Sequence, residues 1–115
     1  MKSKSKSYCS ENENFLKYVT TCNKKQREAL IRKASPSEVN ALCECVFNVY
    51  KRNVRLPDSI ISRLHPFKKT IVKIARNPRA PIYKKRKLIL QQGKGAFVPI
   101  LLASLIPSIV SLFQK

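Results

Sequence analysis

The chain has 115 residues, with 24 lysines and arginines against six aspartates and glutamates, so its formal net charge is +18. This length allows one small domain. A compact domain so unbalanced in charge repels itself unless an anionic partner, nucleic acid or anionic lipid, neutralises it. The first residues are polar with no apolar run behind them, so we expect no secretory signal peptide. The four cysteines then belong to a reducing compartment, and two glycines are too few for a loop-rich disulfide scaffold.

The positive charge is concentrated in the second half of the chain. Asp58 is the last acid, and residues 59–115 hold twelve basic side chains and no acid, whereas the first half has a net charge of +6. We therefore expect the anion-binding surface to be built mainly from residues after Asp58. Three alternating lysines lie within residues 1–9, which the polar composition predicts to be a disordered basic arm.

Helix-start signals along residues 10–92 predict an all-α domain, a small bundle of four or five short helices. Ser10 with Glu13, and then Asn23 with Gln26, have the spacing of a capping box, in which each side chain bonds the backbone N–H of the other residue. Both pairs precede apolar residues at helical spacing. The two pairs therefore predict that helices start close to them.

The clearest helix start is the sequence Ser35-Pro36-Ser37-Glu38. It has an N-cap serine, a proline at the first helical position and a glutamate placed to close the box. The helix that follows carries one apolar stripe at spacings of three and four residues, which is typical of a side that faces the core. The residues of this stripe are Val39, Leu42, Cys43, Val46 and Tyr50.

Prolines divide the second half of the domain into short helices. Pro57 opens a short segment, and Pro66 starts a new turn because the residue before a proline is pushed away from helical geometry. Pro81 starts a basic helix that is expected to run over residues 82–92. Residues 93–95 contain both glycines and are predicted to end this helix and to form a hinge.

Residues 96–115 are predicted to form an apolar C-terminal tail. Its first eighteen residues, AFVPILLASLIPSIVSLF, carry no charge, and this length is at the lower limit for crossing a bilayer, which takes roughly 20 residues. Pro99 and Pro107 interrupt the run and favour an interfacial, inserted or helix-packed segment over a simple membrane anchor. The residues expected to contact a membrane or another hydrophobic surface are Phe97, Val98, Ile100, Leu101, Leu102, Leu105, Ile106, Ile109, Val110, Leu112 and Phe113.

The sequence offers little for catalysis or metal binding. His65 is the only histidine, and no pair of carboxylates remains to act as acid and base. Cys43 and Cys45 would point roughly 200° apart on a helix and could not share one tetrahedral ion there. A zinc site that uses Cys22, Cys43 or Cys45 with His65 lacks the C-x-x-C pattern, and the sequence around residues 93–95 lacks the frame of a phosphate-binding loop. We therefore expect a non-enzymatic protein without a metal or cofactor.

The bases that follow Asp58 are the candidate nucleic-acid contacts. Because no acid is interspersed among them, they are expected to form a continuous positive surface that binds phosphates by charge and counterion release, with little sequence selectivity. The four consecutive bases of residues 84–87 also fit a nuclear localisation signal. The candidate contacts are Lys68, Lys69, Lys73, Arg76, Arg79, Lys84, Lys85, Arg86 and Lys87.

Three segments together resemble a known viral family. They are KKQREALIRKASPSEVNALCECVFNVYKRN (residues 24–53), LHPFKKTIVKIA (64–75) and KKRKLILQQGKGAFVPILLASLIPSIV (84–110). Their order and composition are similar to the X-type basic core proteins of adintoviruses and Maverick/Polinton elements, which are in turn similar to the X (mu-precursor) core protein of adenoviruses. The resemblance covers about three quarters of the chain, and its motifs are compositional, not catalytic.

The resemblance implies a virion protein that is packaged with double-stranded DNA and found in the virion and the host nucleus. Capsid proteins and a viral cysteine protease are the further partners it implies. Such a protease would cut between Lys94 and Gly95, where both glycines of its recognition pattern are in place. Gln91 departs from that pattern, because an aliphatic residue is expected at its position.

Three functional hypotheses follow from these patterns. The first is a DNA-condensing virion core protein whose apolar tail is membrane-active or contacts the capsid. The second is a membrane-surface protein that binds anionic lipid through its basic domain and inserts residues 96–113. The third is a helical interaction module whose tail docks in a partner protein, and this hypothesis gains if the tail is buried against the domain's own core.

Overall fold

The computed structural model describes residues 8–51, 56–91, 93 and 95–103, and every regular element within these ranges is helical. The predicted all-α class is confirmed, with more helices than the four or five expected. In chain order the elements are α1 (Tyr8–Glu11), α2 (Glu13–Thr21), α3 (Lys24–Lys33), α4 (Pro36–Tyr50), α5 (Asp58–Leu64), the 3-10 helix η1 (His65–Phe67), α6 (Lys68–Ala75) and α7 (Ile82–Leu90). Residues 97–103 form a further helical segment, which we call the 97–103 helix.

Two of the predicted capping boxes are present. At the start of α3, the Asn23 side chain accepts a bond from the Gln26 backbone N–H (2.9 Å), and Gln26 accepts one from the Asn23 N–H (3.0 Å). At the start of α4, Ser35 and Glu38 exchange the same two bonds at 3.1 and 2.9 Å. These side chains satisfy backbone donors that have no partner inside the helix, so the local sequence sets where both helices begin.

The predicted capping box of Ser10 and Glu13 is wrong. Ser10 lies inside α1, and α2 begins at Glu13 with Asn12 as the residue before it. The Asn12 side chain does not cap α2; its amide donates to the Ser37 hydroxyl of α4 (2.8 Å) and to the Tyr8 carbonyl of α1 (2.8 Å). A tertiary contact between the start of the chain and α4 therefore divides this segment into two helices where one was expected.

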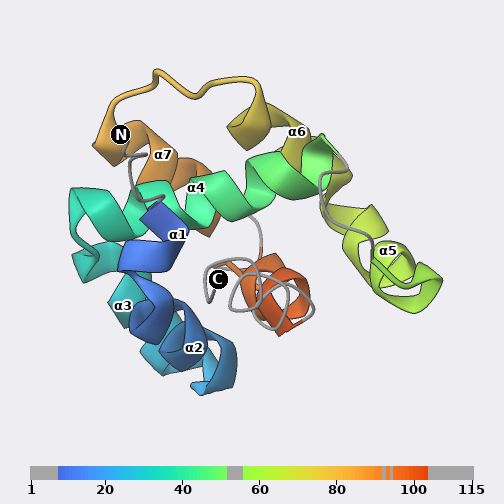
Figure 1. The fold of residues 1–115 in the computed structure, drawn as a ribbon, viewed down its shortest axis with the longest axis horizontal. Helices are drawn as coiled ribbons and strands as arrows, with labels where there is room; N and C mark the ends of the chain where they lie inside the picture. Colours follow the sequence, from blue (N-terminus) through green and yellow to red (C-terminus); the bar gives the residue numbers. More distant parts are fainter. Residues whose placement is uncertain (1–7, 52–55, 92, 94, 104–115) are drawn as a thin grey trace.

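Helix α4 is the longest element and the centre of the fold, with α6 and α7 on one side of it (Figure 1). It packs against α1, α6 and α7, so more than one side of it is covered. The predicted stripe is correct at Val39, Leu42 and Val46, which are all buried. The buried cysteine, however, is Cys45 and not Cys43, which is only half-buried along with Tyr50. A single stripe describes a helix with one covered side, and α4 has more.

The prolines end and start helices as predicted. Pro57 and Pro81 are the residues immediately before α5 and α7, and both have the extended backbone geometry of an N-cap. Pro66 lies in η1, which leads directly into α6. Helix α7 ends at Leu90, slightly earlier than expected, and Gly93 follows with a positive φ of 59°.

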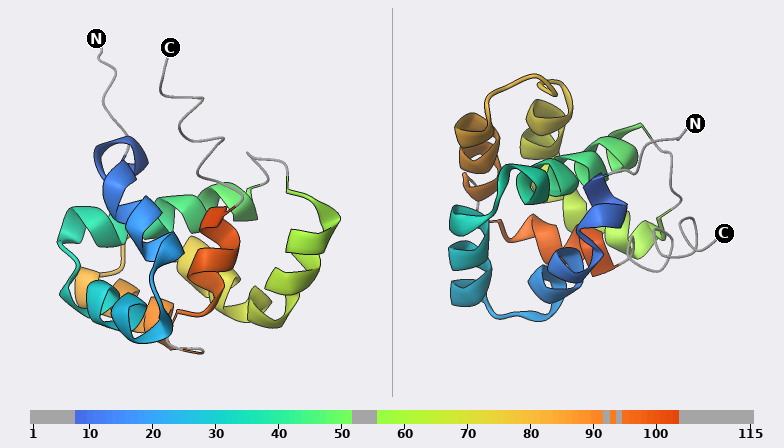
Figure 2. Two further views of the ribbon diagram at one scale, coloured as in Figure 1. Left: turned by 90° about the horizontal axis from the view of Figure 1, so that it is seen from below. Right: turned by 60° about the vertical axis from the view of Figure 1, so that its left-hand side comes forward.

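The apolar run after residue 95 does not form a separate tail over its described part. Phe97, Val98, Leu101 and Leu102 are at most 3% exposed and belong to the same buried cluster as the residues of α2, α3 and α4. The ring of Phe97 lies 6.0 Å from that of Phe67 of η1, measured between centroids. Figures 1 and 2 show the 97–103 helix in the middle of the molecule, with α2 and α3 on one side and α5 on the other.

The expectation of a boundary between domain and tail at residue 96 therefore needs correction. The apolar sides of α2, α3 and α4 have to be shielded from water, and the 97–103 helix of the same chain shields them. Ile100 is half-buried against the same cluster. The remaining predicted contact residues of the run, Leu105, Ile106, Ile109, Val110, Leu112 and Phe113, lie outside the described residues, as does the predicted basic arm apart from its last two positions.

The glycines predicted to form a hinge make a packed turn. Gly95 is buried, with a φ of 83°, a conformation that costs little only for glycine. A Cβ atom at Gly95 would lie 2.9 Å from Cδ1 of Ile31 in α3, which is too close for van der Waals contact. The turn therefore brings the chain against α3 and directs Phe97 into the core.

We predict that Phe97→Ala lowers the free energy of unfolding by about 3–5 kcal/mol, because it removes a fully buried aromatic ring and leaves a cavity. Urea denaturation followed by circular dichroism measures the change. Tyr18→Ala is the matched control, since Tyr18 is 54% exposed and its truncation should change stability by no more than about 0.5 kcal/mol. Equal stabilities of the Phe97 variant and the parent chain would contradict the packing of this segment in the core.

Candidate polyanion-binding surface

The exposed side of α6 carries four of the predicted nucleic-acid contacts. The opposite side buries Thr70, Ile71, Ile74 and Ala75 against the core. Helical spacing then turns the remaining positions outward on one continuous face. The residues of this face, which we call the α6 basic face, are Lys68, Lys69, Lys73 and Arg76, and all four are exposed.

The bases of the α6 basic face have no acid partner among the described residues. Both ion pairs found in the described part of the chain join residues of the first half: Lys17 with Glu13 (3.5 Å) and Arg32 with Glu28 (2.8 Å). Exposed pairs of this kind contribute only about 0.2–1 kcal/mol to stability. The bases of the α6 basic face form no such pair in the described part of the chain, so no described carboxylate neutralises their charge.

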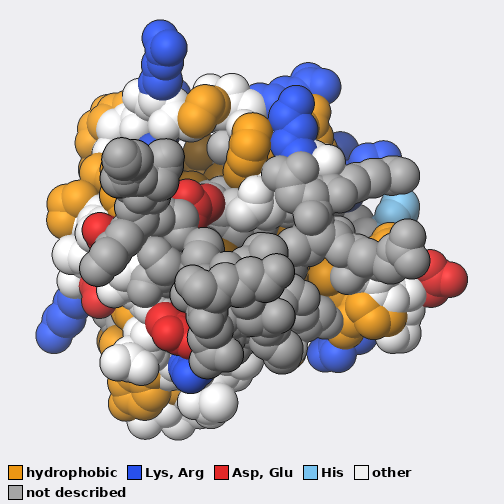
Figure 3. All heavy atoms as spheres, in the orientation of Figure 1, with side chains coloured by type: hydrophobic (Ala, Val, Ile, Leu, Met, Phe, Trp, Pro, Cys, Tyr) orange, Lys and Arg blue, Asp and Glu red, His pale blue; other side chains and the backbone are white. Residues whose placement is uncertain are grey.

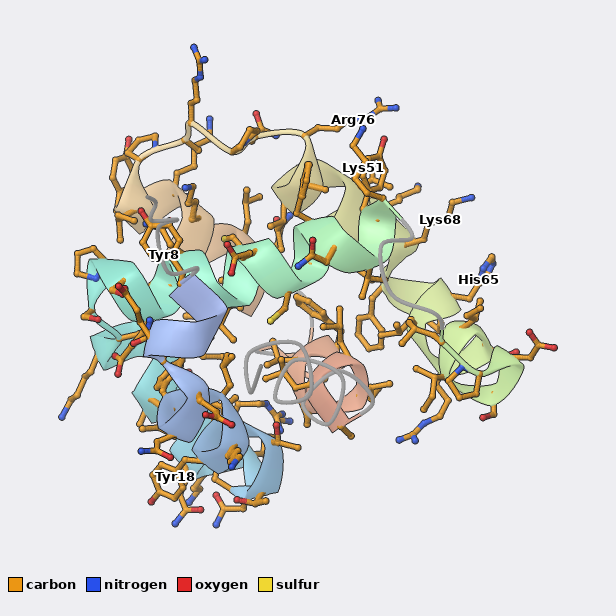
Figure 4. All side chains as sticks on the ribbon, viewed as in Figure 1. Tyr8, Tyr18, Lys51, His65, Lys68 and Arg76 are labelled. Atoms are coloured by element: carbon orange, nitrogen blue, oxygen red, sulfur yellow. The ribbon has the colours of Figure 1, made fainter. Side chains whose placement is uncertain are left out.

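Further bases extend the positive surface on both sides of α6. Lys51 at the end of α4 is exposed, and Figure 4 shows it with Lys68 and Arg76 where the end of α4 meets α6. Arg79, also exposed, lies in the connection from α6 to α7, and α7 packs against α6. On the face drawn in Figure 3, basic side chains gather at the upper right over this region, whereas most of the acidic ones lie on the left.

Arg76 is fixed by a hydrogen bond to α4. Its Nε donates to the hydroxyl oxygen of Tyr50 at 3.3 Å. This bond, together with the positive charge of Arg76, lowers the pKa of the Tyr50 phenol, and the same bond, together with the charge of the ionised phenol, raises the pKa of Arg76. The contact orients one guanidinium at the junction of α4 and α6 and leaves its other N–H groups free to meet an anion.

The predicted run of four bases in α7 divides into exposed and anchored residues. Lys84 and Lys87 are exposed and available to a partner. Lys85 is half-buried and donates from Nζ to Oδ1 of Asn40 in α4 at 2.9 Å. Arg86 reaches α3, where Nε donates to the Ile31 carbonyl (3.1 Å) and Nη2 to the Ala34 carbonyl (2.6 Å). These two side chains hold α7 against its neighbours.

Arg86 donates to two carbonyl groups at the end of α3, one of which, that of Ile31, also accepts from the Ala34 backbone N–H at 3.3 Å. The last carbonyls of a helix carry partial negative charge, so a guanidinium there is favourable both as a hydrogen-bond donor and as a cation. Sequence reasoning placed Arg86 with the nucleic-acid contacts because it lies in a run of bases. Its structural partner is more than fifty positions away in the chain and could not be inferred from that run.

An open depression of about 400 Å³ lies between the end of α3 and one side of α7. We call it the α3–α7 depression, and it is lined by Arg32, Tyr83, Arg86, Lys87, Leu90 and Gln91. Sequence reasoning missed Tyr83, although the spacing of the α7 residues by three and four positions places them on one side of a helix. It also missed Arg32, for which the sequence offers no signal, because only the packing of α3 on α7 brings it there.

The residues considered for metal binding and catalysis do not come together. His65 is exposed at the start of η1 and points outward beside α5 (Figure 4). Cys43 and Cys45 both lie in α4, and Cys22 follows α2. Within the described ranges, no three histidine, cysteine or acidic side chains are grouped as a metal site requires.

Burial raises the pKa of the Cys43 thiol from 9.0 to about 11, and the nearby positive charge of Lys85 opposes this shift. The neutral thiol is therefore favoured. A nucleophilic or metal-binding cysteine needs the opposite, a thiolate formed at lower pH. Cys43 is accordingly part of the packing between α4 and α7, in the neighbourhood of Lys85.

The predicted cleavage position is the bond between Lys94 and Gly95, and Gly95 is buried. Gly95 packs against Ile31 in the turn after α7, and Lys94 lies outside the described residues. A protease needs an exposed, extended segment, so the folded chain does not present Gly95 for cleavage. Among the described residues, no helix is both long enough and apolar enough to cross a bilayer.

Comparison with known proteins identified no relative of this chain. No family model, no curated protein and no solved structure matches this chain.

We predict that Arg86→Ala lowers the free energy of unfolding by about 1.5–3 kcal/mol, because the carbonyls at the end of α3 lose a charged donor. Lys84→Ala removes an exposed base from the same helix and should change stability by no more than about 0.5 kcal/mol. Thermal and urea unfolding of the two variants test this difference. Similar losses in both variants would mean that Arg86 acts only through its charge.

We also predict that the stability of the fold declines between pH 9 and 11 partly through Cys43. The thiol has a pKa of about 11 in the folded chain and 9.0 as its ordinary value, so in this window the folded state binds more protons than the unfolded state. The free energy of unfolding therefore falls as the pH rises. Urea titrations under reducing conditions should show a shallower decline for Cys43→Ala than for the parent chain, and parallel curves would contradict the assignment.

Proposed function

We propose that this protein is a non-enzymatic, sequence-independent binder of double-stranded DNA. The observation that carries the proposal is the α6 basic face, four exposed bases with no acid partner among the described residues. Charges that a fold does not use, and that repel one another, are retained at a cost to stability unless a polyanion neutralises them. Duplex DNA presents a regular array of phosphates that such a surface can neutralise.

The residue types on the α6 basic face support binding without sequence selectivity. The α6 helix is eight residues long, its exposed side chains are lysines, and Arg76 follows directly after it. Direct readout in the major groove usually adds asparagine, glutamine or a bidentate arginine aimed at base edges. Contacts from lysine to phosphate position a protein on the duplex but carry no sequence information.

From the resemblance to X-type core proteins we further propose that this activity serves in a virion, as a DNA-condensing core component that also enters the host nucleus. This part of the proposal rests on the sequence pattern alone. Capsid contacts and processing by a viral cysteine protease belong to the same proposal. Since Gly95 is buried, processing would require that the turn after α7 first opens.

The burial of Phe97, Val98, Leu101 and Leu102 favours DNA over a membrane as the main partner. Inserting these residues in a bilayer would remove them from the core and expose the apolar sides of α2, α3 and α4. The hypothesis of a helical interaction module gains from the same burial, since a segment that packs on its own core can also pack on a protein. The exposed positive charge still calls for an anionic partner, which that module alone does not explain.

We predict that affinity for a random-sequence duplex falls steeply with salt and that the slope depends on the α6 basic face. Lys69→Ala combined with Lys73→Ala should reduce the slope of log K against log salt by about 2, because each phosphate contact contributes about 0.9. Fluorescence anisotropy at several salt concentrations measures both slopes. The expected loss of affinity is similar for unrelated duplex sequences.

The matched control removes two exposed lysines from the first half of the chain. Lys24→Ala with Lys25→Ala lowers the net charge by the same amount, and both residues are exposed at the start of α3. Its slope should change by less than about 1 if binding is localised on α6. Equal changes in the two double variants, or binding that does not depend on salt, would overturn the proposal.

Anionic vesicles provide the comparison for the lipid alternative, with the whole chain in both arms. A chain shortened at Gly93 would lose core residues together with its apolar run, so truncation cannot separate the two functions. We expect vesicle binding to disappear at salt concentrations that still allow duplex binding. Salt-resistant flotation of the whole chain would favour the membrane hypothesis instead.

A further inference from the structure

We propose that the α3–α7 depression binds a nucleotide with an unpaired base, so that the protein engages single-stranded nucleic acid through a site separate from the α6 basic face. The inference rests on the proposed function in one respect, namely that nucleic acid is the partner. It adds a second ligand class, because a duplex does not present a free base face.

The chemistry of the depression combines cations with an exposed aromatic ring. Arg32, Arg86 and Lys87 supply three positive charges, and no acid is among the lining residues. Tyr83 is 71% exposed, more than the other large apolar or aromatic side chains at the described surface. A phosphate group can meet the cations while a base stacks on the ring, the combination found in proteins that bind single strands.

Both arginines are held in place before any ligand arrives. Arg86 uses Nε and Nη2 on the carbonyls of Ile31 (3.1 Å) and Ala34 (2.6 Å). Arg32 uses the same two nitrogens on one carboxylate oxygen of Glu28, at 3.0 and 2.8 Å. A guanidinium has five N–H groups, so each arginine keeps three for an anion. Fixing a side chain in advance reduces the entropy lost on binding.

Glu28 limits what kind of anion the depression can hold. It neutralises part of the charge of Arg32, so the strongest interaction is expected at Arg86 and Lys87 on the α7 side. Tyr83 is three residues before Arg86 and lies on the same side of α7, so a phosphate bound by these two bases would have the ring on its own side of the helix. One phosphate and its neighbouring base, and not an extended run of phosphates, therefore fit this arrangement.

A lipid headgroup would explain fewer features of the α3–α7 depression than a nucleotide does. It would use the cations but has no flat ring to stack on Tyr83, whose exposure would then be unexplained. The half-buried Leu90 also lines the depression and adds apolar surface to it. An apolar flat group joined to a phosphate matches both features, and a nucleotide is the ligand class that has both.

The test compares an unstructured oligothymidylate with a duplex hairpin, using the whole chain at one fixed salt concentration. Tyr83→Ala should weaken binding of the single strand by about fivefold to 150-fold, since stacking of one base contributes about 1–3 kcal/mol. Binding of the duplex should change by less than about twofold. Tyr83→Phe keeps the ring and should keep single-strand binding.

Two controls separate this site from the α6 basic face. Tyr18→Ala removes another exposed tyrosine, from α2, and should leave both ligands unaffected. Lys69→Ala with Lys73→Ala should weaken the duplex more than the single strand. Because Tyr83 is exposed, its truncation does not threaten folding, and circular dichroism checks this.

The outcomes distinguish this inference from the proposed function. If the parent chain binds the duplex with a steep salt dependence but Tyr83→Ala leaves the single strand unaffected, or weakens both ligands equally, the nucleotide site is wrong and the duplex proposal stands. If the parent chain fails to bind the single strand at all, the inference is also wrong. If single-strand binding depends on Tyr83 while duplex binding is absent, the site stands and the duplex proposal fails.

Discussion

The packing of the 97–103 helix against α2, α3 and α4 is the interaction on which the rest of the structure depends. Helices of this length are only marginally stable alone, and most of their stability comes from burying an apolar side. Phe97, Leu101 and Leu102 cover those sides from within, and the turn at Gly95 brings them there. The core formed in this way does not include the exposed sides of α6 and α7. These sides can therefore carry positive charge.

The basic residues in the second half of the chain fall into two groups with different surroundings. Lys85 and Arg86 fix α7 to α4 and α3, whereas the α6 basic face has no acid partner among the described residues and only its Arg76 is hydrogen-bonded to α4. An anchored arginine also has donors to spare, so Arg86 belongs both to the fold and to the α3–α7 depression. The exposed charge of this protein therefore lies in two places, the α6 basic face and the α3–α7 depression, which differ in shape and in the residue types around them.

Local sequence signals predicted much of the fold. The capping boxes at Asn23 and Ser35 and the helix starts after Pro57 and Pro81 are present because each depends on residues a few positions apart. The prediction failed at Ser10, where the contact of Asn12 with Ser37 of α4 outweighs a local cap. It also left open whether Phe97 and its neighbours meet a membrane or another hydrophobic surface, because an uncharged run looks the same whether it covers a core or meets a membrane.

By itself the sequence determined the all-α class, the ends of most helices and the concentration of positive charge after Asp58, which are properties of composition and short spacing. Only the tertiary structure decided which bases stay free and which are used internally, because Arg86 meets its partners across more than fifty positions. Only the tertiary structure, through the packing of α3 on α7, places Arg32 and Tyr83 at the same depression. The physical reason is the same in each case: hydrogen bonds and apolar contacts between distant segments depend on the packing of the whole chain, which no local pattern contains.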